Sequence, residues 1–125
     1  MTTYAAITSM NDHYYNHTGK VMMKSYSEYF DNDIPLNVYN EDASIFKIKN
    51  VNSIDWDLGN DYQQFQKRWE HNSKIQGFSK KAFSIIHAMH NIECDRLIWL
   101  DADTIVTRPV LSQLLQLISP DDILS

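Results

Sequence analysis

The alternation of apolar and polar residues along the chain predicts short strands separated by helices. The apolar run from Tyr4 to Thr8 is typical of a strand, and the polar turn at 9–12 follows it, with Asn11 or Asp12 as a helix cap. Helical spacing predicts that helix from Tyr15, Met22, Tyr26, Tyr29 and Phe30. Residues 34–39 then alternate like a second strand, which ends in the polar residues 40–42.

The middle of the chain has a weaker pattern. Residues 45–49 predict a short strand, and residues 51–60 read as a loop. Asn60 or Asp61 is expected to cap a helix, and residues 71–77 are polar enough for another loop. The inner face of the helix between them would carry Tyr62, Phe65, Gln66 and Trp69.

A clearer helix is predicted after this region. Ser79 is the expected N-cap, with Phe78 and Phe83 as a hydrophobic staple. Its apolar stripe would be Ala82, Ile85, Ile86 and Met89. A strand should follow over 97–100, and a last helix should open at Thr107-Arg108-Pro109, while residues 123–125 resemble the start of another strand. The apolar face of that last helix would carry Leu111, Leu114, Leu115 and Ile118.

This order of elements predicts an α/β fold, in which helices flank a mostly parallel sheet. A chain of 125 residues suffices for one domain with a real core, so residues 1–125 are expected to form a single domain. Since residues 123–125 resemble the start of an element, we expect this domain to be incomplete at its C-terminus and to belong to a longer protein.

Composition and charge narrow the function classes. The hydrophobic content is 43% and the charged content 22%, and the net charge of -5 disfavours binding to nucleic acid backbones. Cys94 is the only cysteine, so an internal disulfide is impossible and a reducing compartment fits best. With no basic N-terminal region and no long apolar stretch, the sequence predicts neither a signal peptide nor a membrane span, and we expect a cytoplasmic protein.

Two carboxylates follow the strand predicted at 97–100. In an extended chain Asp101 and Asp103 point to the same side, and Ala102 points to the other. Adjacent carboxylates at the end of a buried strand repel each other and lose hydration, and a divalent cation with oxygen ligands would offset both costs. The alternative is two solvated loop carboxylates. The pattern therefore predicts a metal site at the carboxyl edge of the sheet, where open α/β folds bind ligands.

The stretch from Cys94 to Val106 resembles the D-x-D region of GT-A-fold glycosyltransferases. It is closest to the glycogenin-like group, in which an apolar strand runs into Asp-Ala-Asp-Thr. The order of elements, a Rossmann-like nucleotide-binding half, is similar over nearly the whole chain, but the resemblance is specific only over 78–110.

The resemblance implies a glycosyltransferase that binds a nucleotide-sugar donor, a UDP-sugar by this match, together with Mn²⁺ or Mg²⁺. Asp103 would coordinate the metal directly, and Asp101 would bind the metal or the donor ribose. Ala102 lies between them in the same donor-binding segment. The metal would bridge both phosphates and offset charge on the leaving nucleoside diphosphate. The acceptor is not identified by any residue.

Further donor contacts are implied by the same resemblance. Residues Thr8, Ser9 and Met10 would lie against the nucleoside. Glu41 or Asp42 would accept a hydrogen bond from the base. Lys81 would reach the donor phosphate or sugar, and its place in the first turn of the predicted helix is electrostatically unfavourable, which favours a functional role.

Two other functions remain open. Phosphatases of the haloacid dehalogenase type also carry a strand followed by D-x-D, with the first Asp as nucleophile and the second as acid/base. Their motif normally continues with Gly-Thr near the start of the domain, and here Thr104 directly follows Asp103. The second alternative is a noncatalytic module in which the carboxylates hold a cation for stability or dock a partner.

The remaining candidate residues favour structural roles. The pair His87 and His90 lacks acidic or cysteine partners at matching spacing, and the pair His13 and His17 lacks the glutamate of a zinc-protease helix. Arg108 is read as a surface residue, and Cys94 has no neighbouring base.

Overall fold

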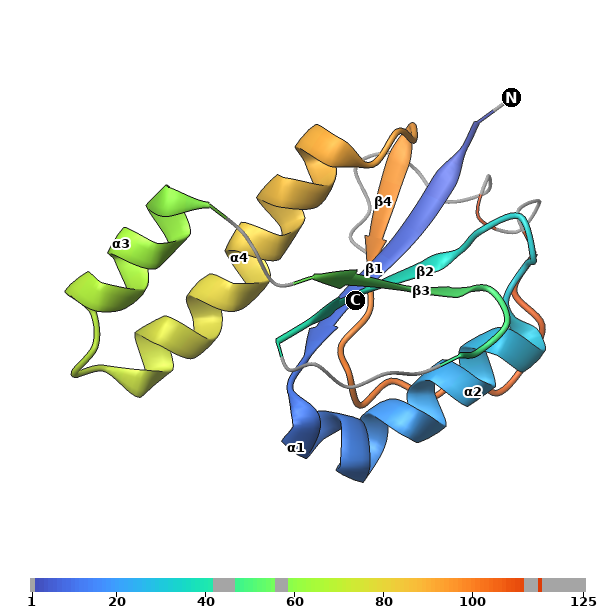
Figure 1. Cartoon of the computed structure of the whole chain (residues 1–125). Coiled ribbons are helices and arrows are strands. Elements are labelled where there is room, and N and C mark those ends of the chain that lie inside the picture. Colours follow the sequence, from blue (N-terminus) through green and yellow to red (C-terminus); the bar gives the residue numbers. More distant parts are fainter. Residues whose placement is uncertain (1, 42–46, 56–58, 112–114, 116–125) are drawn as a thin grey trace.

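The computed structural model describes residues 2–41, 47–55, 59–111 and 115. At its centre is a parallel sheet of four strands in the order β3-β2-β1-β4 (Figure 1). The strands are β1 (Tyr4–Met10), β2 (Leu36–Asn40), β3 (Val51–Asp55) and β4 (Arg96–Trp99). The predicted α/β class, with a parallel sheet and flanking helices, is confirmed.

One face of the sheet is covered by a helical segment that follows β1. It comprises α1 (Asp12–Tyr14), the π-helical turn η1 (Tyr15–Gly19) and α2 (Lys20–Tyr29). Met22, Met23 and Tyr26 of α2 are fully buried. They pack against residues of β1 and β2, so this interface forms the larger apolar core.

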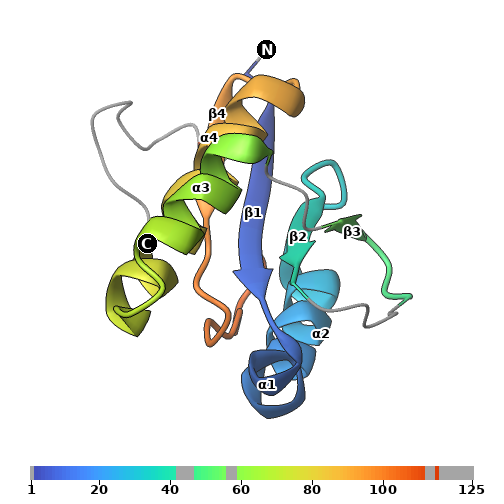
Figure 2. The same ribbon diagram turned by 60° about the vertical axis from the view of Figure 1, so that its left-hand side comes forward.

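The opposite face is covered by α4 (Ser73–Asn91), against which α3 (Asn60–Arg68) packs (Figures 1 and 2). Ala88 of α4 is fully buried together with Ile7 and Tyr39 of the sheet. Rings of Tyr62 and Phe83 meet edge to face at 5.2 Å and join α3 to α4.

The strand order fixes where the two connections separate. The chain passes from β1 to β2 through α2 on one face, and it reaches β4 through α4 on the other face. Because β2 and β4 lie on opposite sides of β1, the connections diverge beyond the carboxyl ends of β1 and β4. Crevices at such a point are the usual ligand sites of open parallel sheets.

Several sequence predictions are confirmed in detail. The strands predicted at 4–8, 34–39 and 97–100 match β1, β2 and β4 within a few residues. Asn11 caps the first helix, since its Oδ1 accepts a hydrogen bond from the backbone N–H of Tyr14 at 2.9 Å. The polar turn expected to start at Ser9 begins later, because Ser9 and Met10 remain in β1 and pair with Tyr39 and Asn40.

The loop predicted at 51–60 is wrong over its first half, which forms β3. This strand pairs with β2 in register, with Val51 opposite Leu36 and Ile54 opposite Tyr39. An edge strand needs few apolar residues, and the polar Asn52 and Ser53 disguise the pattern. Of the strand predicted at 45–49, only Lys47 to Lys49 lie within the described residues, and they are not in a strand.

The start of α4 is also corrected. The helix begins at Ser73 rather than after Ser79, and its cap is Asn72, whose Oδ1 accepts from the N–H of Ile75 at 3.2 Å. Ser79 is a buried interior residue whose hydroxyl donates to the carbonyl of Gln76. The predicted staple is absent, because the Phe78 side chain is 77% exposed.

Three further predictions about the helices are wrong. α3 begins after Gly59 without a side-chain cap, so neither Asn60 nor Asp61 caps it. Ile86 and Met89 of the expected apolar stripe are exposed, because Ser84 and Ala88 face the sheet instead. Residues 107–111 do not begin a helix.

Val110 instead forms a parallel bridge with Phe30. Most of the last predicted helix, and the strand predicted at 123–125, lie outside the described residues. Within the described part of the chain, no helix has the length and apolar character needed to cross a membrane.

Candidate functional site

A cleft of about 750 Å³ opens at the carboxyl edge of the sheet, where the two connections diverge. Its floor is formed by Ser9 and Met10 at the end of β1 and by Trp99 at the end of β4. Glu41 follows β2 on one side, and the turn at 101–103 follows β4 on the other. A volume in this range suits a small-molecule ligand.

The acidic motif forms a turn rather than a continuation of the strand. β4 ends at Trp99, and the N–H of Thr104 donates to the carbonyl of Asp101 at 2.9 Å. The expected alternation of an extended chain therefore does not apply to Asp101 and Asp103. Both carboxylates are exposed and both line the cleft. The turn therefore brings them to the same cleft, although they do not lie on one side of an extended strand.

Trp99 connects the acidic turn with α4. Its indole Nε1–H donates to Oδ1 of Asp101 at 2.7 Å. The ammonium group of Lys81 lies 5.2 Å from the centre of the same indole ring, within the range of a cation–π interaction. A carboxylate and a cation at the cleft thus share one half-buried aromatic side chain.

An ion pair spans another side of the cleft. The ammonium group of Lys80 lies 2.5 Å from Oε1 of Glu41, and these side chains are 32% and 17% exposed. Glu41 is therefore paired with Lys80. The resemblance implied instead that Glu41 or Asp42 would accept a hydrogen bond from the base of the nucleotide. Such a pair is screened less than a fully exposed one because both side chains are partly withdrawn from water.

The beginning of α4 supplies the opposite wall. The residues of α4 that line the cleft recur at helical spacing. They include the cationic Lys74 and the apolar Phe78. The full set is Ser73, Lys74, Gly77, Phe78, Lys80 and Lys81. Asn11 and Tyr14 complete the wall below β1.

Most residues expected to bind a donor lie together. Ser9, Met10, Glu41, Lys81, Asp101, Ala102 and Asp103 all line the cleft. Thr8 does not, since its side chain is fully buried and its hydroxyl has no hydrogen-bond partner within the described residues. Asp42 lies outside the described residues.

Trp99, Lys74 and Phe78 were not predicted as site residues. Trp99 lies within the strand predicted over 97–100, and its role depends on the turn that brings Asp101 back to its indole. The helical recurrence of 74, 78 and 81 is a signal that the sequence contains. This recurrence does not stand out in the sequence, because the polar residues 71–77 predict a loop and so place the start of the helix later.

The chemistry of these residues fits a divalent cation held jointly with a ligand. No group of three or more His, Cys, Asp or Glu side chains suited to a metal occurs among the residues that the structure describes. Mg²⁺ and Mn²⁺ prefer oxygen ligands, and Mg²⁺ commonly binds through one or two carboxylates, water and phosphates of the substrate. Asp101 and Asp103 are side chains that could supply such partial coordination.

The other chemically active side chains lie away from the cleft wall. His87 meets the buried Tyr39 hydroxyl through Nδ1 at 2.8 Å. His13 and His17 stack at 4.1 Å on the surface of the first helical segment. Burial, followed by the neighbouring Asp95 charge, raises the pKa of the Cys94 thiol, which disfavours a reactive thiolate.

No protein-family model, curated protein or solved structure matches this chain. What the chain does must therefore be argued from the cleft itself.

Proposed function

We propose that the cleft binds a nucleotide-sugar donor, a UDP-sugar, together with Mn²⁺ or Mg²⁺, and that the chain is the donor-binding part of a Rossmann-like GT-A glycosyltransferase. The observation that carries the proposal is the meeting of Asp101, Asp103 and Lys81 at the cleft beyond β1 and β4. This is the edge at which open parallel sheets bind nucleotides.

The distribution of charge supports a diphosphate ligand with a metal. Besides the paired Lys80 and Glu41, two lysines at positions 74 and 81 and two carboxylates, Asp101 and Asp103, line the cleft. A ligand with negative phosphates needs the cations, and a bound metal needs the carboxylates. A cleft lined by charges of one sign alone would suit either the phosphates or the metal, but not both.

Each residue then has a defined role. Asp103 and Asp101 would hold the metal, which on binding would neutralise charge on the leaving nucleoside diphosphate. Lys81 would contact a phosphate, with its ammonium group already directed along the cleft wall by Trp99. Ser9 and Met10 at the end of β1 would border the nucleoside.

Calorimetric titration of UDP, with and without Mn²⁺, tests this proposal. We expect binding that requires Mn²⁺ and that falls at least tenfold in Asp103→Ala, because this substitution removes one of the two carboxylates that would hold the metal. Glu93→Ala is the matched control, since Glu93 is exposed and does not line the cleft.

The two other candidate functions give different results in the same experiment. A phosphatase would hydrolyse p-nitrophenyl phosphate in the presence of Mg²⁺, and Asp101→Asn would abolish that hydrolysis. A noncatalytic cation module would bind Mn²⁺ equally well with and without UDP. A folded protein that shows no binding of UDP under any condition would contradict the donor site.

A further inference from the structure

We infer that Trp99 is the positioning residue of this cleft, which orients the Asp101 carboxylate for the metal and the Lys81 ammonium for the phosphates at the same time. The inference rests on the proposed function. It adds to that site a residue that acts through Asp101 and Lys81. Its basis is the contact of one indole with both groups.

The two groups that Trp99 contacts are exposed. Asp101 follows the end of β4, and Lys81 lies on the outer surface of α4. Exposed lysine and aspartate side chains sample several rotamers, the long lysine most of all, and ordering them on ligand binding costs conformational entropy. An existing contact that holds them near one geometry lowers that cost.

Trp99 itself is well fixed. It is the last residue of β4, pairs with Ile7 of β1 and packs against the cluster that contains Tyr39 and Ala88. The following residue is held as well, since the N–H of Leu100 donates to the carbonyl of Ile7 at 3.0 Å. The indole is therefore a rigid platform in the lining of the cleft.

The two contacts are chemically distinct. The indole N–H can only donate, and its acceptor is a carboxylate oxygen, so the hydrogen bond to Asp101 is charge-assisted and restrains the position of Oδ1. The ring face attracts the Lys81 cation through its quadrupole. Phenylalanine would keep the second contact and lose the first, which allows the two to be tested separately.

The first measurement is the affinity for Mn²⁺ at saturating UDP, from the paramagnetic resonance signal of free Mn²⁺. We expect Trp99→Phe to weaken Mn²⁺ binding about tenfold, as is typical when the outer partner of a metal ligand is lost. In the Asp101→Ala background the same substitution should have no further effect. Trp69→Phe, at the end of α3 and outside the cleft, is the matched control for loss of an indole.

The second measurement separates the effect of the aromatic ring on Lys81 from the effect of the indole N–H on Asp101. Trp99→Leu should weaken UDP binding about twofold to fivefold beyond Trp99→Phe, because it removes the surface that holds Lys81. With Lys81→Met this additional loss should disappear. A general packing defect would instead persist in the Lys81→Met background.

A spectroscopic measurement reports the hydrogen bond without any ligand. In the metal-free protein the indole N–H resonance of Trp99, identified by its loss in Trp99→Phe, should shift in Asp101→Ala, while the Trp69 resonance stays in place. If wild type binds Mn²⁺-UDP and Trp99→Phe binds it equally well, the positioning role is overturned and the donor site stands. If wild type binds no nucleotide, both fail.

Discussion

The two faces of the sheet are built for different purposes. On the α2 face, Met22, Met23 and Tyr26 are fully buried. On α4 the large apolar residues Phe78 and Met89 are 77% and 68% exposed. The α2 face thus buries the larger side chains, whereas α4 buries the small Ser84 and Ala88 and its first turns line the cleft.

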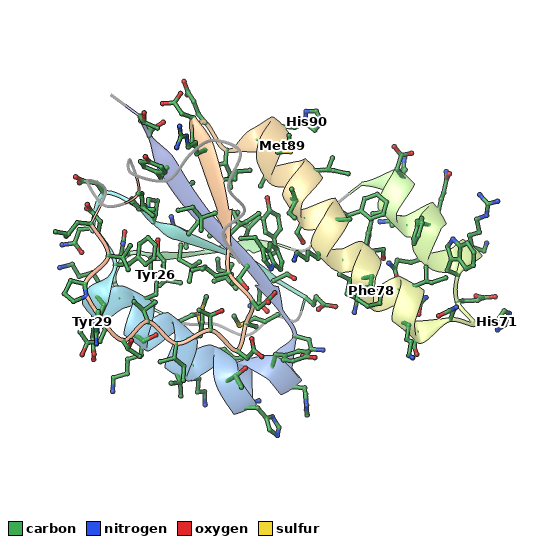
Figure 3. All side chains as sticks on the ribbon, turned by 180° about the vertical axis from the view of Figure 1, so that it is seen from behind. Tyr26, Tyr29, His71, Phe78, Met89 and His90 are labelled. Carbon is green, nitrogen blue, oxygen red and sulfur yellow. The ribbon has the colours of Figure 1, made fainter. Side chains whose placement is uncertain are left out.

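Figure 3 illustrates this difference. Tyr26 lies among the side chains between α2 and the sheet, whereas Met89 and His90 project from the end of α4. The Tyr26 ring also stacks on Phe30 with centroids 4.2 Å apart, and its hydroxyl donates to the carbonyl of Ile34 at 2.5 Å. Packing, stacking and hydrogen bonding therefore coincide on the α2 face.

The largest effect is expected from a pair of methionine substitutions, one on each helix. Met22→Ala should lower the free energy of unfolding by about 2–5 kcal/mol, since it opens a cavity in the main core. Met89→Ala should change it by less than about 0.5 kcal/mol, because that side chain is mostly exposed. Urea denaturation measures both, and equal losses would contradict the division between the faces.

A glycine pair sharpens the same comparison. An added Cβ at Gly19 would lie 2.7 Å from Sδ of the buried Met10 and 3.2 Å from the carbonyl oxygen of Tyr14. Gly19→Ala should therefore destabilise the protein by about 1–2 kcal/mol. A Cβ at Gly77 meets nothing within 4 Å, and Gly77→Ala should stabilise α4 by about 0.5–1 kcal/mol. Thermal unfolding of the two variants should shift in opposite directions.

Alkaline unfolding compares a tyrosine on each face. Burial raises the pKa of Tyr39 to about 12, and burial together with Asp31 raises the pKa of Tyr26 further above its ordinary value of 10. Folding favours the neutral form of each, so their contribution is present below pH 10 and is lost as the pH rises above it. Between pH 9 and 11 both hydroxyls stay neutral in the folded protein, so Tyr26→Phe and Tyr39→Phe should reduce this alkaline loss by similar amounts. Only above about pH 12, where Tyr39 ionises in the folded protein, should Tyr26→Phe have the larger effect on unfolding.

The smallest effect is expected at the junction of α4 with the sheet. The N–H and hydroxyl of Thr3 donate to Oδ2 of Asp95 and lower the pKa of that carboxyl below 3.8. Because the folded protein favours the charged form, the contribution is present above about pH 4 and is lost as the pH falls. Asp95→Asn should be slightly less stable at pH 7, and this gap should narrow at pH 3. A gap that is equal at both pH values would show that charge is not its cause.

The sequence predicted the strands best where apolar residues are consecutive. β1 and β4 are predicted because their apolar residues are consecutive, even though β4, like β3, lies at an edge of the described sheet. The helix of Tyr26 is predicted because its buried face is wide. β3 was missed, because an edge strand is half solvated and its apolar residues, Val51 and Ile54, are too few to show a period. The beginning of α4 was missed since the open cleft removes the apolar stripe there.

The candidate site shows the same limit. Sequence placed Asp101, Asp103 and Lys81 near one another by resemblance, and the structure brings all three to the cleft. It did not predict the Lys80–Glu41 pair or the Trp99 contacts, because these depend on side chains from separate elements meeting at distances that no local pattern encodes.

The strand order has a consequence for how the molecule assembles. Pairing of β1 with β2 joins near neighbours, but the contact between Thr3 and Asp95 beside β4 closes a loop of 92 residues. Long-range closures carry the larger entropic cost and form slowly. We expect β1, β2 and α2 to collapse first and β4 to dock late, so that the cleft is completed only in the final stage of folding.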